Sequence, residues 1–271
     1  MHFSDPSYQF PQIEALRSGK VLSTGTTLPM SLEGVDRVTG ERGQFIVKFI
    51  KSPRMSEKAS AKELIAAWIA MELDLPVVEP AIIHISQDFV ESMRGYEGYV
   101  TASQSVGENF GSRYRNGFQE ILAGQKFSGR MEADSLRIFG FDLFITNADR
   151  GHQRSNVHTN GEEFLIFDHE MSFSHVSILS FVRSKRPWII SEHEKTLYEK
   201  HVFYPYLKNK EQDFTTFASD LQRIDDSFWE KVETLLPPAW NTTEVAEIRD
   251  YLFEIVKHRD EFADQLIQTL L

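Results

Sequence analysis

The sequence predicts an α+β fold, with a small β-rich N-terminal lobe and a mainly helical C-terminal lobe. Between residues 21 and 50, glycines and prolines separate short β-branched runs, a pattern typical of hairpins. Most of the chain beyond residue 118 shows instead the apolar spacing of amphipathic helices. Since 271 residues exceed the usual size of one domain, we expect two lobes that share a cleft, residues 1–104 and 105–271.

Strands and one helix account for the first lobe. The segment Phe45–Ile50 is the clearest strand, because it is apolar at every position except Lys48. Residues 60–73 place apolar side chains on one helical face and stop before Pro76, so they predict a helix directly after that strand. Two further strands are predicted at residues 76–85 and 96–101, and a loop is predicted at residues 106–112.

The pattern of the second lobe is that of helices joined by short loops. Amphipathic helices are predicted over 118–127, 134–145, 191–207 and in three or four segments between 213 and 271. Pro237 and Pro238 interrupt the last stretch, because proline cannot continue a helix. The sequence contains no internal repeat, which disfavours solenoid and propeller folds.

Composition excludes several classes of protein. With 29 basic and 40 acidic residues the net charge is −11, which disfavours binding to duplex nucleic acid or to an anionic membrane. The chain has no cysteine, so disulfides, thiolate metal sites and cysteine nucleophiles are excluded. Neither a secretion signal nor a long apolar run is present. We therefore expect a cytoplasmic protein that binds neither membranes nor, directly, nucleic acids.

Two polar segments in the second lobe carry the residues best suited to chemistry. The first is NADRGHQRSN, residues 147–156, and the second is LIFDHE, residues 165–170. Between them, Asn160-Gly161 is typical of a type I′ turn, because both positions need a positive φ. The pattern predicts a hairpin in which residues 156–159 run antiparallel to residues 162–165.

At the open end of this hairpin, Asn156 and Asp168 are expected to lie close together. An amide oxygen and a carboxylate, beside a loop that supplies Asp149, suit a magnesium ion that keeps several waters and binds phosphate oxygens. This combination indicates a nucleoside triphosphate as the substrate. Lys48, with Glu63 near the start of the next helix, fits the pattern of a lysine held by a glutamate and directed at the α- and β-phosphates.

The chain resembles the HipA-like branch of the protein-kinase-like fold, and its Asp-Arg motif is also similar to the catalytic loops of phosphatidylinositol 3- and 4-kinases. The resemblance is carried by Lys48 in FIVKF, by Glu63 in AKELIAAWIAMELDLPV, and by the segments NADRGHQRSN and LIFDHE. Asp149 and Asn156 are separated by six residues, two more than in protein kinases, and this longer spacing favours the HipA-like branch.

The resemblance implies a bilobal protein-kinase-like fold, with a nucleotide-binding sheet and helix in residues 1–104 and a catalytic loop and metal-binding hairpin in residues 105–271. It implies a serine/threonine kinase that uses ATP and Mg²⁺. The implied roles are ATP binding for Lys48 and Glu63, a phosphate-covering loop for Thr24, Gly25, Thr26 and Thr27, catalysis for Asp149, Arg150 and His152, and Mg²⁺ binding for Asn156 and Asp168. The implied partners are a protein with a Ser or Thr acceptor, including this chain itself, and an antitoxin-like protein.

Simpler interpretations of the same residues remain open. Lys48 would serve equally as an edge-strand lysine that prevents pairing between sheets, and Glu72 competes with Glu63 as its partner. Arg150 could pair with Asp168 or with a neighbouring carboxylate. The protein could also bind nucleotide as a scaffold without turnover.

A further hypothesis is a metalloenzyme of another class. Four histidines occur near the two candidate aspartates in the sequence: His152, His158, His169 and His175. Two histidines and one carboxylate would form an iron site or a hydrolytic metal site. The alternation along the hairpin does not direct these histidines to one point, so the kinase hypothesis is preferred.

Overall fold

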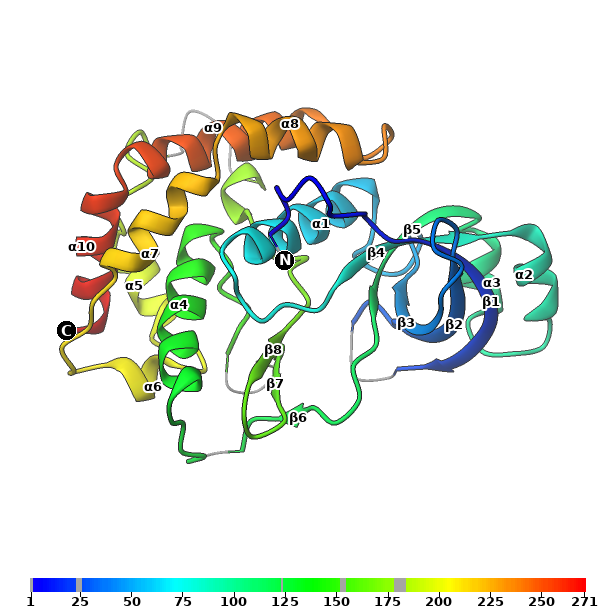
Figure 1. Ribbon diagram of the computed structural model, residues 1–271, viewed down its shortest axis with the longest axis horizontal. Helices are drawn as coiled ribbons and strands as arrows, with labels where there is room; N and C mark the ends of the chain where they lie inside the picture. Colours follow the sequence, from blue (N-terminus) through cyan, green and yellow to red (C-terminus); the bar gives the residue numbers. More distant parts are fainter. Residues whose placement is uncertain (1, 23–25, 123, 152–154, 178–183) are drawn as a thin grey trace.

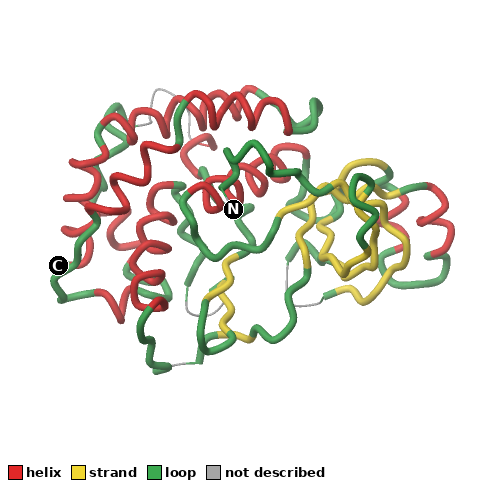
Figure 2. Tube along the Cα trace, viewed as in Figure 1, coloured by secondary structure: helices red, strands yellow, loops and turns green. Residues whose placement is uncertain are grey.

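The computed structural model describes residues 2–22, 26–122, 124–151, 155–177 and 184–271 (Figure 1). Helices and strands are both present, which confirms the α+β class predicted from the sequence. Figure 2 shows that the longest strands gather at one end of the molecule, whereas most of the helices lie at the other end.

A closed barrel forms from the N-terminal strands, in the order β1-β2-β3-β5-β4. Its strands are β1 (Gln12–Val21), β2 (Met30–Asp36), β3 (Arg42–Lys48), β4 (Pro80–Ile85) and β5 (Gly107–Arg113). All neighbouring strands are antiparallel except β1 and β4, which are parallel. Buried and partly exposed residues alternate along β2, as expected for a strand with one face towards the barrel interior.

Strand β5 corrects one prediction. The loop predicted over residues 106–112 is wrong, because β5 occupies this segment and pairs with both β3 and β4. Glycines suggested the loop, but Gly111 is required within the strand: a Cβ atom there would lie 2.7 Å from the carbonyl oxygen of Ile46. Strand β5 completes the barrel, so the last residue of the barrel strands is Arg113.

Helix α1 (Glu57–Glu72) connects β3 to β4 and confirms the helix predicted over residues 60–73. Ser56 begins the helix, because its side chain accepts a hydrogen bond of 3.2 Å from a backbone N–H of the first turn. Asp74, with a left-handed φ of 53°, and the following Pro76 end it.

Two short helices follow β4, α2 (Gln87–Ser92) and α3 (Tyr99–Ser103). The strand predicted over residues 96–101 is therefore wrong. Gly98 begins α3 with a φ of 84°, a conformation that glycine adopts at low cost. Ala102 of α3 is buried in the apolar core of the barrel, so tertiary packing favours the helix.

A second sheet has three short strands in the order β6-β7-β8. These are β6 (Gln119–Glu120), β7 (Val157–Thr159) and β8 (Phe164–Ile166). The helix predicted over residues 118–127 is wrong, because this segment supplies β6, which pairs with β7. Gly124, with a φ of 76°, prevents a continuous helix there.

The hairpin predicted around Asn160-Gly161 is present with a different turn. Gly161 has a positive φ of 95° but Asn160 does not, so the turn is not of type I′. The side chain of Asn160 instead accepts two backbone hydrogen bonds of 2.9 Å. Relative to the predicted register, the pairing of the two strands is shifted by two residues, which places Asn156 opposite Phe167. Because the shift is even, each side chain stays on the face of the hairpin that was predicted for it.

Helices form most of the remaining chain, which we call the helical region. They are α4 (Arg130–Phe144), α5 (Glu192–Tyr198), α6 (Tyr204–Leu207), α7 (Thr215–Asp220), α8 (Asp226–Leu235), α9 (Thr243–Lys257) and α10 (Arg259–Leu270), with 3₁₀ turns at Ser174–Ser177 and Leu221–Arg223. The helices predicted over 134–145 and within 213–271 are confirmed, and the prediction over 191–207 divides into α5 and α6. Among the described residues, no helix has both the length and the apolar composition that crossing a lipid bilayer requires.

Two separate apolar cores hold the structure together. One fills the barrel and includes Ile13, Phe45 and Ile83. The other extends through the helical region and includes Leu64 and Trp68 of α1. Helix α1 follows the barrel strand β3 in the chain and packs on β4 and β5, and its apolar side chains also belong to the core of the helical region.

Candidate functional site

Lys48 lies at the centre of a buried group of charges. Its ammonium donates a hydrogen bond to Glu63 of α1 and another, of 2.6 Å, to Oδ1 of Asp168. Oε2 of Glu170 lies 3.7 Å from the same nitrogen. One oxygen from each of the three carboxylates lies within 4.8 Å of the others. We call these four residues the Lys48 cluster; it unites three residues predicted from the sequence and adds Glu170.

The charges of this cluster do not balance. Burial alone would lower the pKa of Lys48, but the three carboxylates raise it, so the ammonium stays charged. Burial raises the pKa of Glu63 to about 7, although Lys48 opposes the effect. Burial would also raise the pKa of Asp168, but Lys48 and its hydrogen bond lower it. With Arg54 as its other cation, the cluster contains more carboxylates than cations, which favours the binding of a divalent metal.

Asp149 lies in the loop after α4 and is exposed. Its backbone N–H donates a hydrogen bond of 3.2 Å to the side-chain oxygen of Asn147. Burial raises the pKa of Glu170, and the charges of Asp168 and Asp149 raise it further. Asp149 is therefore within electrostatic reach of the Lys48 cluster, as the sequence predicts.

Arg150 bonds to a carboxylate that the sequence did not suggest. Its guanidinium contacts Asp142 of α4 through two hydrogen bonds, of 2.5 and 3.1 Å. It also donates to the backbone oxygens of Asn156 at 2.7 Å and Phe167 at 3.4 Å. Arg150 thus holds the two segments that carry Asn156 and Asp168. The side chain of Arg150 is fully buried.

Asp142 is itself fully buried and fully hydrogen-bonded. Besides Arg150, it accepts hydrogen bonds from Asn147 at 3.0 Å and from the ring of His201 at 2.9 Å. Burial would raise the pKa of Asp142, but Arg150 and His201 lower it. A buried ion pair is stable only when its remaining polar atoms are bonded, and both carboxylate oxygens meet this condition. We call Asp142, Asn147, Arg150 and His201 the Asp142 cluster.

Asn156 and Asp168 share an unusual backbone conformation. Their φ angles are 49° and 60°, in the left-handed region, which costs about 1 kcal/mol even though Asn and Asp tolerate it better than most residues. The carbonyl of Asn156 accepts a hydrogen bond of 3.2 Å from Phe167, the residue before Asp168. Strained backbone at both predicted metal ligands is typical of functional sites.

Only part of the predicted phosphate-covering loop is described. Thr24, Gly25 and the predicted catalytic His152 lie outside the described residues. Thr27 is buried, and the hydroxyl of Thr26 accepts a hydrogen bond of 3.1 Å from Arg54. The same guanidinium lies 3.2 Å from Glu170, so the described end of this loop is connected to the Lys48 cluster.

The simpler interpretations of Lys48 are wrong. Strand β3 lies between β2 and β5, so Lys48 does not protect a sheet edge. Glu72 does not compete with Glu63, because it accepts hydrogen bonds of 2.7 and 2.8 Å from Ser4.

Histidines do not form a metal site with carboxylates within the part of the chain that the structure describes. The group of metal-competent side chains found there consists of Glu63, Asp168 and Glu170. The ring of His158 packs on a phenylalanine and that of His175 stacks on a tyrosine. Burial lowers the pKa of His169 to about 3, so it is neutral. The metalloenzyme hypothesis is wrong for these three histidines.

Sequence reasoning missed five residues of the two clusters and their surroundings: Asp142, Asn147, Glu170, His201 and Arg54. Asp142 gave a usable signal, since it is a single carboxylate within the apolar run FGFDLF. Glu170 gave another, because it follows Asp168 by two residues. His201 and Arg54 occur in polar connections where no pattern marks them, and only the fold brings them to the site.

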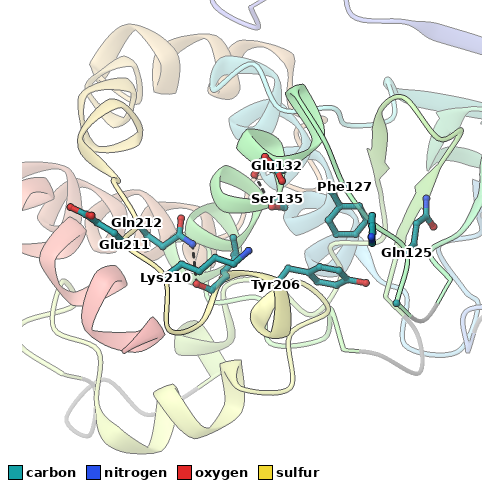
Figure 3. A pocket seen from close by; sticks show the side chains of 11 residues that line it. Gln125, Phe127, Glu132, Ser135, Tyr206, Lys210, Glu211 and Gln212 are labelled. Carbon is teal, nitrogen blue, oxygen red and sulfur yellow. Dashed lines mark hydrogen bonds between the residues drawn. The ribbon is translucent and has the colours of Figure 1, made fainter.

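A cavity of about 450 Å³ lies elsewhere, between α4 and the loop after α6 (Figure 3). Phe127 and Tyr206 form part of its wall, together with Glu132 and Lys210. Its described lining includes no member of the Lys48 or Asp142 cluster. Because charges of both signs line it, the cavity does not indicate a class of ligand.

Comparison with known proteins agrees with this geometry. A search of curated proteins finds no match. The family model described as HipA-like kinase matches residues 39–265, which include both clusters and most of the chain. The match confirms the resemblance seen in the sequence and indicates a kinase-type phosphotransferase. The chain therefore belongs to the HipA-like kinase family.

Proposed function

We propose that the protein is a kinase that uses ATP and Mg²⁺ to phosphorylate a serine or threonine hydroxyl of a protein. The observation that carries this proposal is the meeting of Lys48 from β3, Glu63 from α1 and Asp168 from the segment after β8. Protein kinases need a strand lysine paired with a helix glutamate, and an aspartate that holds Mg²⁺, in place together.

In the proposed bilobal fold, the barrel is the small lobe and the helical region is the large lobe. The division would fall after Arg113, the last residue of the barrel. Lys48 then belongs to the small lobe and Asp149 to the large lobe, so the triphosphate would lie between them. This placement is the expected one for a kinase active site.

Each residue has a distinct proposed task. Asp168 and Asn156 would hold Mg²⁺, and the excess of carboxylate oxygens in the Lys48 cluster suits this hard cation. Lys48 would contact the α- and β-phosphates. Asp149, exposed in its loop, would orient the acceptor hydroxyl and accept its proton. When bound, Mg²⁺ would neutralise the negative charge of the phosphates. Catalysis of phosphoryl transfer depends mostly on such electrostatic stabilisation and on the positioning of the reactants.

The acceptor is proposed from the family resemblance. It is a protein with a Ser or Thr hydroxyl, including this chain itself, and an antitoxin-like protein is the proposed partner. Neither a membrane nor a nucleic acid is proposed as a partner, since the net charge of −11 opposes both. A cytoplasmic location remains a prediction from the sequence.

Incubation with γ-labelled ATP, Mg²⁺ and host lysate tests the proposal. We expect label on the protein itself or on a lysate protein, and we expect Asp168→Ala to abolish labelling. Glu72→Gln is the matched control, because Glu72 is a buried acid outside the Lys48 cluster. Labelling by folded Asp168→Ala at the wild-type level would contradict the proposal. Calorimetric binding of ATP with no transfer by the wild type would support the scaffold hypothesis instead.

A further inference from the structure

Glu170 is a nearly buried carboxylate whose two oxygens differ in their surroundings. Its side chain is 6% exposed. Oε1 lies 3.2 Å from a guanidinium nitrogen of Arg54. Oε2 is buried and finds no hydrogen-bond donor among the described residues, and it lies 3.7 Å from the ammonium of Lys48. A buried carboxylate oxygen without a hydrogen bond is destabilising, so this oxygen indicates a missing partner.

The position of Glu170 identifies the kind of partner. Glu63 is already bonded, since its two oxygens accept hydrogen bonds from Lys48 and from the backbone N–H of His169. Glu170 has an oxygen without a hydrogen bond, and its carboxylate supplies one member of the group of three carboxylate oxygens that lie within 4.8 Å of one another. Such a group of hard oxygen ligands suits a divalent cation.

Arg54 contacts the other carboxylate oxygen of Glu170, Oε1. It has a left-handed φ of 66°, an uncommon conformation for a residue other than Gly, Asn or Asp. Its guanidinium bonds at the same time to Thr26, in the connection between β1 and β2, and to Glu170. Its side chain is 43% exposed, so the ion pair with Glu170 can be exchanged more easily than a fully buried one.

We propose that Glu170 is a further metal-binding carboxylate, beyond Asn156 and Asp168, and that Arg54 is its counter-ion in the metal-free protein. When it binds with the triphosphate, the divalent cation becomes the partner of the unbonded Oε2 of Glu170 and takes over from Arg54 as the main positive charge beside this carboxylate. This inference rests on the proposed function, because the triphosphate delivers the cation to the site.

Calorimetric titration of Mn²⁺ into the full-length protein, saturated with a non-hydrolysable ATP analogue, tests this inference. We expect Glu170→Gln, which keeps the shape of the side chain, to weaken Mn²⁺ binding by about tenfold or more, the size of effect seen when support of a metal site is removed. The same variant should bind the metal-free analogue as tightly as the wild type or more tightly, because a negative charge near the phosphates is gone.

Arg54→Gln is the second variant and should show the opposite pattern. Loss of the counter-ion should tighten Mn²⁺ binding and weaken binding of the metal-free analogue. If Glu170 had only a structural role, Glu170→Gln would weaken binding of both Mn²⁺ and the metal-free analogue, and this result would overturn the inference. Unchanged Mn²⁺ binding by Glu170→Gln would overturn it as well.

Glu91→Gln is the matched control, since Glu91 of α2 forms an exposed ion pair with Arg94, which follows the helix. Its Mn²⁺ and analogue affinities should equal those of the wild type. Failure of this inference is distinct from failure of the proposed function. A wild-type protein that binds no Mn²⁺–analogue complex refutes the function, whereas wild-type binding that is the same in Glu170→Gln refutes the role of Glu170 alone.

Discussion

The Lys48 and Asp142 clusters are both buried groups of charges, but they differ in how completely they are hydrogen-bonded. In the Asp142 cluster, one carboxylate receives hydrogen bonds from an arginine, an asparagine and a histidine, and it is fully buried. In the Lys48 cluster, three carboxylates surround one ammonium, and an oxygen of Glu170 has no hydrogen bond among the described residues.

This difference separates a structural task from a binding task. A carboxylate whose hydrogen bonds are all made within the protein holds the backbone around it in place. Arg150, which is bonded to this carboxylate, also donates hydrogen bonds to the backbone of the segments that carry Asn156 and Asp168, and so holds them as well. A group with surplus negative charge is costly on its own and becomes stable when it binds a cation. Under the proposed function, the Asp142 cluster therefore fixes the backbone of the site and the Lys48 cluster holds the metal ion and the triphosphate.

The largest expected effect concerns turnover. Asp149→Asn should lower the rate of phosphoryl transfer by about 10²- to 10⁴-fold, the range for a well-placed acid or base. Its stability should hardly change, because Asp149 is exposed. Steady-state kinetics and a thermal melt measure the two quantities. Asp88→Asn, an exposed acid on α2, is the control, and equal rates in both variants would exclude Asp149 from catalysis.

The second effect concerns the free energy of unfolding. Asp142→Ala should destabilise the protein by about 3–5 kcal/mol, because it leaves the buried Arg150 without its carboxylate. Asp168→Ala should cost less, since Lys48 keeps Glu63 as a partner. Urea denaturation of the two variants measures the difference. If Asp142→Ala and Asp168→Ala destabilise the protein equally, the Asp142 cluster is no more structural than the Lys48 cluster, and the comparison fails.

A smaller loss of stability is expected at His201. His201→Leu should destabilise by about 1–3 kcal/mol, the cost of one lost hydrogen bond to a buried carboxylate that keeps its other partners. The exposed His193, replaced by Leu, is the control. If both variants unfold at the same urea concentration, His201 does not contribute to the Asp142 cluster.

The smallest expected effect is a loss of stability at acidic pH, caused by protonation of Asp142. The pKa of Asp142 is lower in the folded protein than its ordinary value of 3.8, through Arg150 and His201 and in spite of burial. Its contribution to stability is therefore complete above about pH 4 and is lost as the pH falls through the folded-state pKa. Between pH 6 and pH 3, the melting temperature of the wild type should fall more steeply than that of Asp142→Asn. Parallel curves would contradict this assignment.

The site was more predictable than the segments around it. Lys48, Glu63 and Asp168 were found because each combines a chemically suitable side chain with a local pattern: a lysine in an apolar strand, an acid in the following helix, an acid after a strand. The structure brings these three together. Arg150 was recognised as important, but its partner Asp142 lies eight residues earlier on a helix whose contacts depend on the whole fold.

Two of the wrong predictions concern segments that contain a glycine. Residues 106–112 were predicted as a loop and residues 96–101 as a strand, yet Gly111 lies in a strand and Gly98 begins a helix. In the first case the neighbouring strands leave no room for a side chain, and in the second a positive φ is required. Sequence pattern shows that glycine is needed at such positions, but only tertiary packing shows the reason.

The contacts of α1 with other elements limit how far this helix can move. Lys58 of α1 forms an ion pair of 2.7 Å with Glu244 of α9, which adds to the apolar contacts that anchor the helix. In protein kinases, movement of the corresponding helix makes and breaks the lysine–glutamate pair. Here α1 contacts both α9 and the barrel strands β4 and β5, so a displacement of the helix that broke the Lys48–Glu63 hydrogen bond would have to break these contacts as well.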